Sequence, residues 1–214
     1  MNRLFKYILL LASVVCNFSC EKEIDLNEYT VTKIYYRTTD DKPITQSDGW
    51  NSEFDSQILA DSYSADNGGC LLVYGNVTVF GTWFQGNSSL VEVSIPSGIK
   101  NISAYAFCNC SSLTSVTIPN SVTTIVTGAF YYCSSLTSIT IPDSVTTIGS
   151  WAFYCCLDLT TVYCKATTPP TGGNGMFISN AADRKIFVPA ESVDAYKSAY
   201  GWKNYASTIV GYDF

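Results

Sequence analysis

The sequence of 214 residues contains no histidine, and it has few charged side chains. Without histidine there is no Ser-His-Asp or Cys-His catalysis and no metal site with imidazole ligands. Charged residues make up 14 % of the chain, against about 25 % in an average soluble domain. The 18 acidic residues outnumber the 12 basic ones, which argues against a nucleic-acid partner, because such proteins need a basic surface. Hydrophobic residues reach 47 %, which supports a core and excludes a disordered chain.

The N-terminal segment, residues 1–19, has the pattern of an export signal. Arg3 and Lys6 supply positive charge, and an apolar run follows at residues 7–15. A helix needs about 20 apolar residues to span a bilayer, so this run is too short to do so. Its proportions are those of the hydrophobic part of a secretory signal peptide. We therefore expect the segment to direct export rather than to fold.

The two cysteines that follow, Cys16 and Cys20, suggest a lipid anchor. A small residue before a cysteine, with charged residues just after it, resembles a bacterial lipoprotein signal. Ser19 is small, and residues 21–23 are similar to the acidic export tag of Bacteroidetes surface lipoproteins, so Cys20 is the expected lipidated residue. Two alternatives stay open: lipidation of Cys16, and an ordinary signal peptide without a lipid.

The middle of the chain repeats every 23 residues. Leucines recur at Leu90, Leu113, Leu136 and Leu159. Ala-Phe pairs, prolines and cysteines keep the same period, with Phe107, Phe130 and Phe153, Pro96, Pro119 and Pro142, and Cys110, Cys133 and Cys156. Degenerate units precede and follow these three. Chance does not produce three such matches, and a period of this length indicates a stacked repeat protein.

The third repeat, residues 136–158, predicts the shape of one coil. Ile139 and Ile141 alternate with polar residues, which is the pattern of a strand with one buried face. Pro142 ends that strand, and the β-branched residues 145–148 predict a second short one. The stretch around Phe153 suits a single helical or 3₁₀ turn. A coil of this kind cannot bury its apolar face alone, so neighbouring coils must stack.

The repeat resembles a known family. Residues 136–159 follow the pattern Leu-x-x-Ile-x-Ile-Pro-x-x-Val-x-x-Ile-Gly-x-x-Ala-Phe-x-x-Cys-x-x-Leu, which is similar to the BspA-like class of leucine-rich repeats. The resemblance implies a mainly β fold, a right-handed leucine-rich-repeat-like solenoid of 23-residue coils with short turns. It also implies an anchored surface protein of host-associated bacteria, in several cases tied to adhesion, and it brings no catalytic residues.

The flanks are expected to close the two ends of the solenoid. Residues 29–37 read as a strand and give a β-rich N-terminal cap. Apolar residues at helical spacing in 191–200 predict a short helix in the C-terminal cap, sealed by three further side chains, Trp202, Tyr205 and Ile209. The expected organisation is a signal peptide at 1–19, an anchor, tether and cap at 20–66, repeats at 67–166 and a C-terminal cap at 167–214.

The cysteines and carboxylates of the repeats give little support for chemistry. Cys110, Cys133 and Cys156 share one apolar column, which indicates buried free thiols that behave as small hydrophobic groups. Their spacing is not that of a zinc site. The acidic residues within the clear repeats fall in different columns, so no carboxylate pair for glycoside hydrolysis is indicated. We expect no enzyme activity, no cofactor and no metal.

Aromatic residues provide the candidate binding site. Tyr105 and Trp151 share one column, Tyr131 and Tyr154 share another, and Tyr132 lies beside the second. Pointing outward, they would form an aromatic stripe suited to sugar rings or protein partners. The alternative is that they only cover the edge of the core.

Two functions remain open from the sequence. The first is a lipid-anchored protein of the outer membrane or cell surface that binds a host or microbial macromolecule. The second is an accessory glycan-binding lipoprotein of a polysaccharide uptake system. The expected partners are an extracellular protein or glycan and, through the lipid, the membrane, with no nucleic acid.

Overall fold

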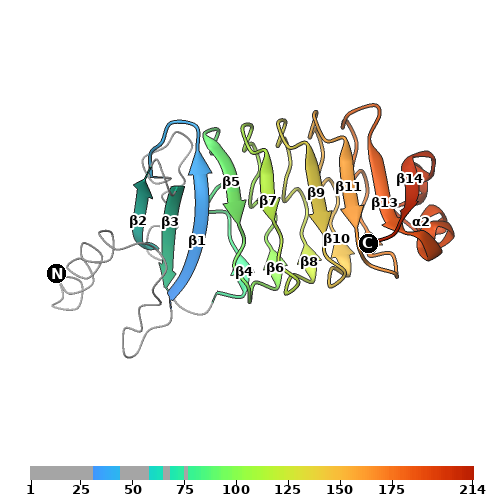
Figure 1. The fold of residues 1–214 in the computed structure, drawn as a ribbon, viewed down its shortest axis with the longest axis horizontal. Coiled ribbons are helices and arrows are strands. Elements are labelled where there is room, and N and C mark those ends of the chain that lie inside the picture. The colour runs from blue at the N-terminus through green and yellow to red at the C-terminus, as the bar shows by residue number, and fades with distance from the viewer. Residues whose placement is uncertain (1–30, 44–57, 65–67, 75–76) are drawn as a thin grey trace.

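The computed structural model describes residues 31–43, 58–64, 68–74 and 77–214. The export signal, Cys16 and Cys20 lie outside these residues. The described chain forms an elongated row of strands (Figure 1), with an antiparallel cap at the N-terminal end and a small helical cap at the C-terminal end. None of its helices is long and apolar enough to cross a membrane.

Each coil contributes one longer strand and one strand of two residues. The longer strands are β5 (Leu90–Ser94), β7 (Ser115–Thr117), β9 (Ser138–Ile141), β11 (Thr161–Cys164) and β13 (Lys185–Pro189). The short strands are β4 (Val79–Phe80), β6 (Asn101–Ile102), β8 (Thr124–Ile125), β10 (Thr147–Ile148) and β12 (Thr171–Gly172). The short strands form one parallel sheet in the order β12-β10-β8-β6-β4. Thr124 pairs with Thr147, so equivalent residues of successive repeats meet across this sheet.

The alternation predicted for the third repeat is confirmed. In β9, Ile139 and Ile141 are buried, and Ser138 and Thr140 are exposed. The second strand is shorter than the sequence predicts, because Val145 belongs to a turn in which its N–H donates to the carbonyl of Pro142 at 3.2 Å. The fold is therefore strand-rich, as expected, with most of each coil in turns.

A ladder of five phenylalanines forms the centre of the core. Its members are Phe80, Phe107, Phe130, Phe153 and Phe177, each fully or almost fully buried. The ring of Phe130 lies 5.0 Å from that of Phe107 and 5.1 Å from that of Phe153, with planes within 7°. Arg184 closes one end of the ladder, with its guanidinium 5.5 Å from the Phe177 ring. The 23-residue period of Phe107, Phe130 and Phe153 thus becomes a stack of rings, and Phe80 and Phe177 extend it at its two ends.

The cysteine column lies beside this ladder and is fully buried. The structure shows free thiols at Cys110, Cys133 and Cys156, as the sequence predicts. They are more than small hydrophobic groups, because each sulfur donates to a phenylalanine carbonyl of the preceding coil. The Cys133 thiol reaches the carbonyl of Phe107 at 3.1 Å. The last coil replaces the thiol with an amide, since Asn180 Nδ2 donates to the Phe153 carbonyl at 2.8 Å.

The N-terminal cap is an antiparallel sheet joined to the first coil. It consists of β1 (Val31–Thr38), β2 (Ile58–Ser64) and β3 (Gly68–Tyr74), and β1 lies between β3 and β5. The strand predicted at residues 29–37 corresponds to β1. β1 pairs with β5 in the antiparallel direction, and this pairing covers the strand edge that the first coil would otherwise expose.

The C-terminal cap contains the predicted short helix. The 3₁₀ turn η3 (Ala190–Ser192) leads into α2 (Val193–Ser198), and η4 (Lys203–Thr208) leads into β14 (Ile209–Tyr212), which pairs with β13 in parallel. The three sealing residues, Trp202, Tyr205 and Ile209, are buried as expected. Trp202 Nε1 donates to the Pro170 carbonyl at 2.7 Å, which ties the cap to the loop before β12.

Candidate binding surface

The candidate site lies on the turns that follow the short strands. The sequence suggested one helical or 3₁₀ turn at this place. The structure instead has separate turns closed by bonds between residues three apart, such as Cys108 N–H to the Tyr105 carbonyl at 3.0 Å. A regular helix does not form because residues within the stretch adopt left-handed backbone angles, with φ of 60° at Tyr105 and 62° at Asn109.

Aromatic residues and glycines alternate at the first of these left-handed positions. Tyr105 (φ 60°) and Trp151 (φ 55°) occupy it in the first and third repeats, and Gly128 (φ 62°) and Gly175 (φ 66°) occupy it in the coils that follow each of them. Glycine adopts such angles without strain. A residue with a side chain loses about 1–2 kcal/mol there, so the two aromatic residues are held in an unfavourable conformation.

Each strained aromatic ring lies against the glycine of the next coil. A Cβ atom on Gly128 would come within 2.5 Å of the Tyr105 ring, and one on Gly175 within 2.9 Å of the Trp151 ring. No side chain fits at either position without moving the ring. The glycines therefore provide the space in which the two rings lie along the surface.

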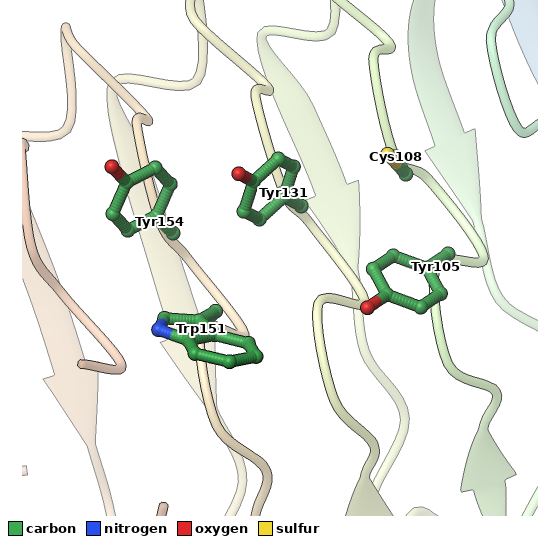
Figure 2. A pocket seen from close by; sticks show the side chains of 5 residues that line it. All are labelled: Tyr105, Cys108, Tyr131, Trp151 and Tyr154. Atoms are coloured by element: carbon green, nitrogen blue, oxygen red, sulfur yellow. The ribbon is translucent and has the colours of Figure 1, made fainter. Parts of the chain in front are cut away.

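The tyrosines of the second column stand beside these rings. Tyr131 and Tyr154 stack on one another at 5.0 Å with planes 11° apart. The Tyr105 ring meets Tyr131 almost at a right angle, 79°, at 6.5 Å. Tyr132 packs against both stacked tyrosines, 4.8 Å from Tyr131 and 6.0 Å from Tyr154. Figure 2 shows Tyr105 and Trp151 in one row, and Tyr131 and Tyr154 in a second row above it.

These side chains line an open cavity of about 480 Å³, which we call the aromatic groove. Its lining residues are Tyr105, Cys108, Tyr131, Trp151 and Tyr154 (Figure 2). None of them carries a charge at neutral pH. Desolvation, followed by the neighbouring Tyr154, raises the pKa of Tyr131, and burial raises the pKa of the Cys108 thiol. The groove therefore offers aromatic faces and neutral hydrogen-bonding groups.

The structure brings together four of the five aromatic residues proposed from the sequence. Tyr132 does not line the groove, and its hydroxyl interacts with Cys155, which raises the pKa of Tyr132. Tyr105, Tyr132 and Trp151 are 40 %, 44 % and 46 % exposed. Tyr131 and Tyr154 are partly buried. The alternative, in which all five side chains only cover the edge of the core, fits Tyr131 and Tyr154. It does not fit the three exposed residues, Tyr105, Tyr132 and Trp151.

Sequence reasoning missed Cys108 and the two glycines. Cys108 is in the column of Tyr131, and Gly128 is in the column of Tyr105 and Trp151, so the period itself contained both signals. It also missed a second aromatic surface at the end of the solenoid, the C-terminal aromatic cluster, formed by Tyr163, Phe187, Tyr212 and Phe214. Tyr163 and Phe187 stack at 5.1 Å because they pair across β11 and β13.

Charged and metal-binding groups do not gather in the described part of the chain. Glu92 faces Arg37 at 3.8 Å on the surface, with both side chains about half exposed. Across the described residues, no group of three or more histidine, cysteine, aspartate or glutamate side chains is arranged to hold a metal ion.

Parallel strands stacked repeat upon repeat, with a continuous leucine, isoleucine and phenylalanine core, define the protein as a leucine-rich repeat protein. The family model for the BspA-type leucine-rich repeat region matches residues 76–199 with six copies. The chain belongs to this family. The resemblance noted from the repeat pattern is thereby confirmed.

Solved structures of bacterial leucine-rich repeat proteins are similar to parts of the chain. A leucine-rich repeat protein from Eubacterium ventriosum is 28 % identical over 56 % of this chain, with a TM-score of 0.47. A leucine-rich cell surface protein from Faecalibacterium prausnitzii is 27 % identical over 52 %, with a TM-score of 0.39. The leucine-rich repeat protein of T. pallidum is 26 % identical over 65 %, with a TM-score of 0.47. The matches span 32 %, 39 % and 63 % of those three chains. A comparison with curated proteins gives no match.

Proposed function

We propose that the protein is a non-catalytic binding module, held at the bacterial surface by a lipid on Cys20, whose aromatic groove binds a host or microbial macromolecule. One observation carries the proposal: the exposed rings of Tyr105 and Trp151 and the parallel rings of Tyr131 and Tyr154 line one uncharged groove. Large aromatic side chains supply much contact area at low entropic cost, which suits them to recognition.

The surface location rests on the sequence of residues 1–23 and on the family. The lipid would anchor the protein in the outer membrane, and the segment between Cys20 and the N-terminal cap would serve as the tether. The proposal includes a right-handed solenoid of 23-residue coils, the sense that crossovers between parallel strands favour. Replacing Cys20 with Ser should release the protein from the membrane fraction, while Cys16→Ser should leave it there. Unchanged partitioning of the Cys20 variant would contradict the anchor.

The binding function is tested with arrays of host proteins and of glycans. The exported chain should bind members of at least one array, and the double variant Tyr131→Ala/Tyr154→Ala should lose that binding. A control variant, Leu157→Ala, removes an exposed apolar side chain that is not part of the groove lining. Binding that survives in the double variant, or that fails equally in the control, would contradict the assignment of the groove.

A second candidate is an accessory protein that holds polysaccharide for a neighbouring uptake system. The absence of charge in the groove lining favours it over adhesion to a protein. If this second function is correct, the protein should bind glycans and no host protein on the arrays, and that result would exclude adhesion to proteins.

A further inference from the structure

Building on the proposed function, we infer that the aromatic groove takes a neutral, extended polysaccharide, lying along the solenoid axis with the Tyr105 and Trp151 rings as two successive platforms. The inference rests on the exposure of the two rings, their spacing and the chemistry of the lining.

The two platform rings are exposed and lie in one row of the groove. Tyr105 and Trp151 are 40 % and 46 % exposed (Figure 2). Each ring lies against a glycine of the next coil, Gly128 or Gly175, so no side chain of that coil covers it. Tyr131 and Tyr154 belong to neighbouring coils, with rings 5.0 Å apart and planes within 11°, and they form one wall of the groove.

The spacing of the platforms follows from the repeat. Tyr105 and Trp151 are two coils apart, because Gly128 occupies the equivalent position in the coil between them. Neighbouring parallel strands lie about 4.8 Å apart, so the two platforms are separated by about 10 Å. In an extended β-1,4-linked glucan, every second sugar ring presents the same face, and its repeat of two rings is close to this separation. Helically curved α-linked chains do not keep this alignment.

The chemistry of the lining suits neutral sugar rings. One face of a β-glucose ring consists of C–H groups and packs on an aromatic face, while its hydroxyls point outward from the ring edge. The Tyr131 and Tyr154 hydroxyls and the Trp151 indole N–H are in place to form hydrogen bonds with such groups (Figure 2). No charged side chain lines the groove, and the chain carries a net charge of −6. An acidic polysaccharide would therefore find no counter-charge and a repelling protein.

The size of the groove also favours an oligosaccharide over a folded protein partner. Its volume of about 480 Å³ lies within the usual range for small-ligand sites, about 300–1,000 Å³. A stable protein interface instead covers about 800 Å² on each partner, which a lining of five residues does not provide.

The test measures binding of three hexasaccharides to the full chain in detergent by titration calorimetry. Cellohexaose is the neutral, extended probe, maltohexaose is the curved α-linked control, and hexagalacturonate is the acidic control. Cellohexaose should bind at least tenfold more tightly than either control. Equal binding of all three, or no binding of cellohexaose, would overturn the inference.

Variants of the platforms locate the binding. Tyr105→Ala and Trp151→Ala should each weaken cellohexaose binding at least tenfold, and Trp151→Phe, which keeps a ring, should retain most of it. Tyr212→Ala is the matched control, since it removes an equally exposed aromatic ring of the C-terminal aromatic cluster. All variants should melt as cooperatively as the parent chain. Undiminished binding in Trp151→Ala would show that the sugar binds elsewhere.

The same variants separate failure of this inference from failure of the proposed function. A protein ligand that is lost in Trp151→Ala, with no binding of cellohexaose, refutes the polysaccharide and leaves the groove as the binding site. If neither a sugar nor a protein ligand depends on Trp151 or Tyr105, the polysaccharide inference and the proposed function are both refuted.

Discussion

Replacing Phe130 with Ala should remove the central ring of the phenylalanine ladder and destabilise the protein by about 4 kcal/mol. Phe130 has no exposed surface and stacks on two rings, at 5.0 Å and 5.1 Å. Truncating a buried phenylalanine usually loses about 3–5 kcal/mol, and a stacked pair contributes about 0.5–1.5 kcal/mol beyond buried area. Two pairs are lost at once, so the effect should fall in the upper half of that range. A domain of this size has about 5–15 kcal/mol of stability in total.

The measurement is urea unfolding of the reduced protein, followed by circular dichroism. Leu157→Ala is the control, because Leu157 is 57 % exposed and such surface changes usually stay within about 0.5 kcal/mol. A repeat array is stabilised by contacts between neighbouring coils, and Phe130 contributes to two of them. If Phe130→Ala lost less than about 2 kcal/mol, the ladder would not be the main contact between coils. If the transition split in two, the array would not unfold as one unit.

Four further outcomes follow from named contacts. Ile139→Asp should abolish the cooperative melt, because Ile139 is 2 % exposed and an unpaired charge would be buried there; a preserved melt would contradict its inward position. Asn180→Ala should lose about 2 kcal/mol, as two backbone carbonyls lose an amide donor, and equal urea midpoints would contradict this. Burial raises the pKa of Cys156 to about 12 and that of Cys164 to about 11, from 9.0. Because the unfolded chain loses these protons at lower pH than the folded protein does, the stability contributed by the two thiols should be complete below pH 9. Above pH 9 the free energy of unfolding should fall by about 1.4 kcal/mol per pH unit for each thiol, until the folded pKa of that thiol is reached. A flat profile between pH 9 and 11 would refute this. Gly128→Ala should weaken ligand binding by displacing the Tyr105 ring, whereas Gly98→Ala, which has a positive φ and open space around it, should only lower stability.

Periodicity predicted those parts of the fold in which each coil repeats its neighbour. Ile139 and Ile141 point inward, and the cysteine column is buried, because identical positions in successive coils meet the same environment. The short helix near residue 196 was also predicted, since Tyr196 lies in a local apolar pattern and is fully buried.

The features that the sequence did not predict depend on contacts between non-equivalent positions. The cysteine thiols bond carbonyls 26 residues earlier rather than 23, for example Cys133 to Phe107, so no column of the alignment shows the pair. The pairing of β1 with β5 joins a segment without repeats to the first coil. β14 returns beside β13 only after α2 and η4 have reversed the chain. Each of these is decided by three-dimensional packing and not by local pattern.

The candidate site depends both on the repeat period and on the contact between each ring and the next coil. Together they limit which coils can carry one of the two aromatic platforms. The left-handed position repeats in four successive coils, at Tyr105, Gly128, Trp151 and Gly175, but an aromatic residue fits there only when the next coil has no side chain in the way. Tyr105 requires Gly128, and Trp151 requires Gly175. Two adjacent coils therefore cannot both carry a platform, and the shortest spacing between platforms is two coils, about 10 Å. The proposed polysaccharide must therefore present recognised groups about 10 Å apart, and a sugar shorter than that distance would contact only one of the two rings.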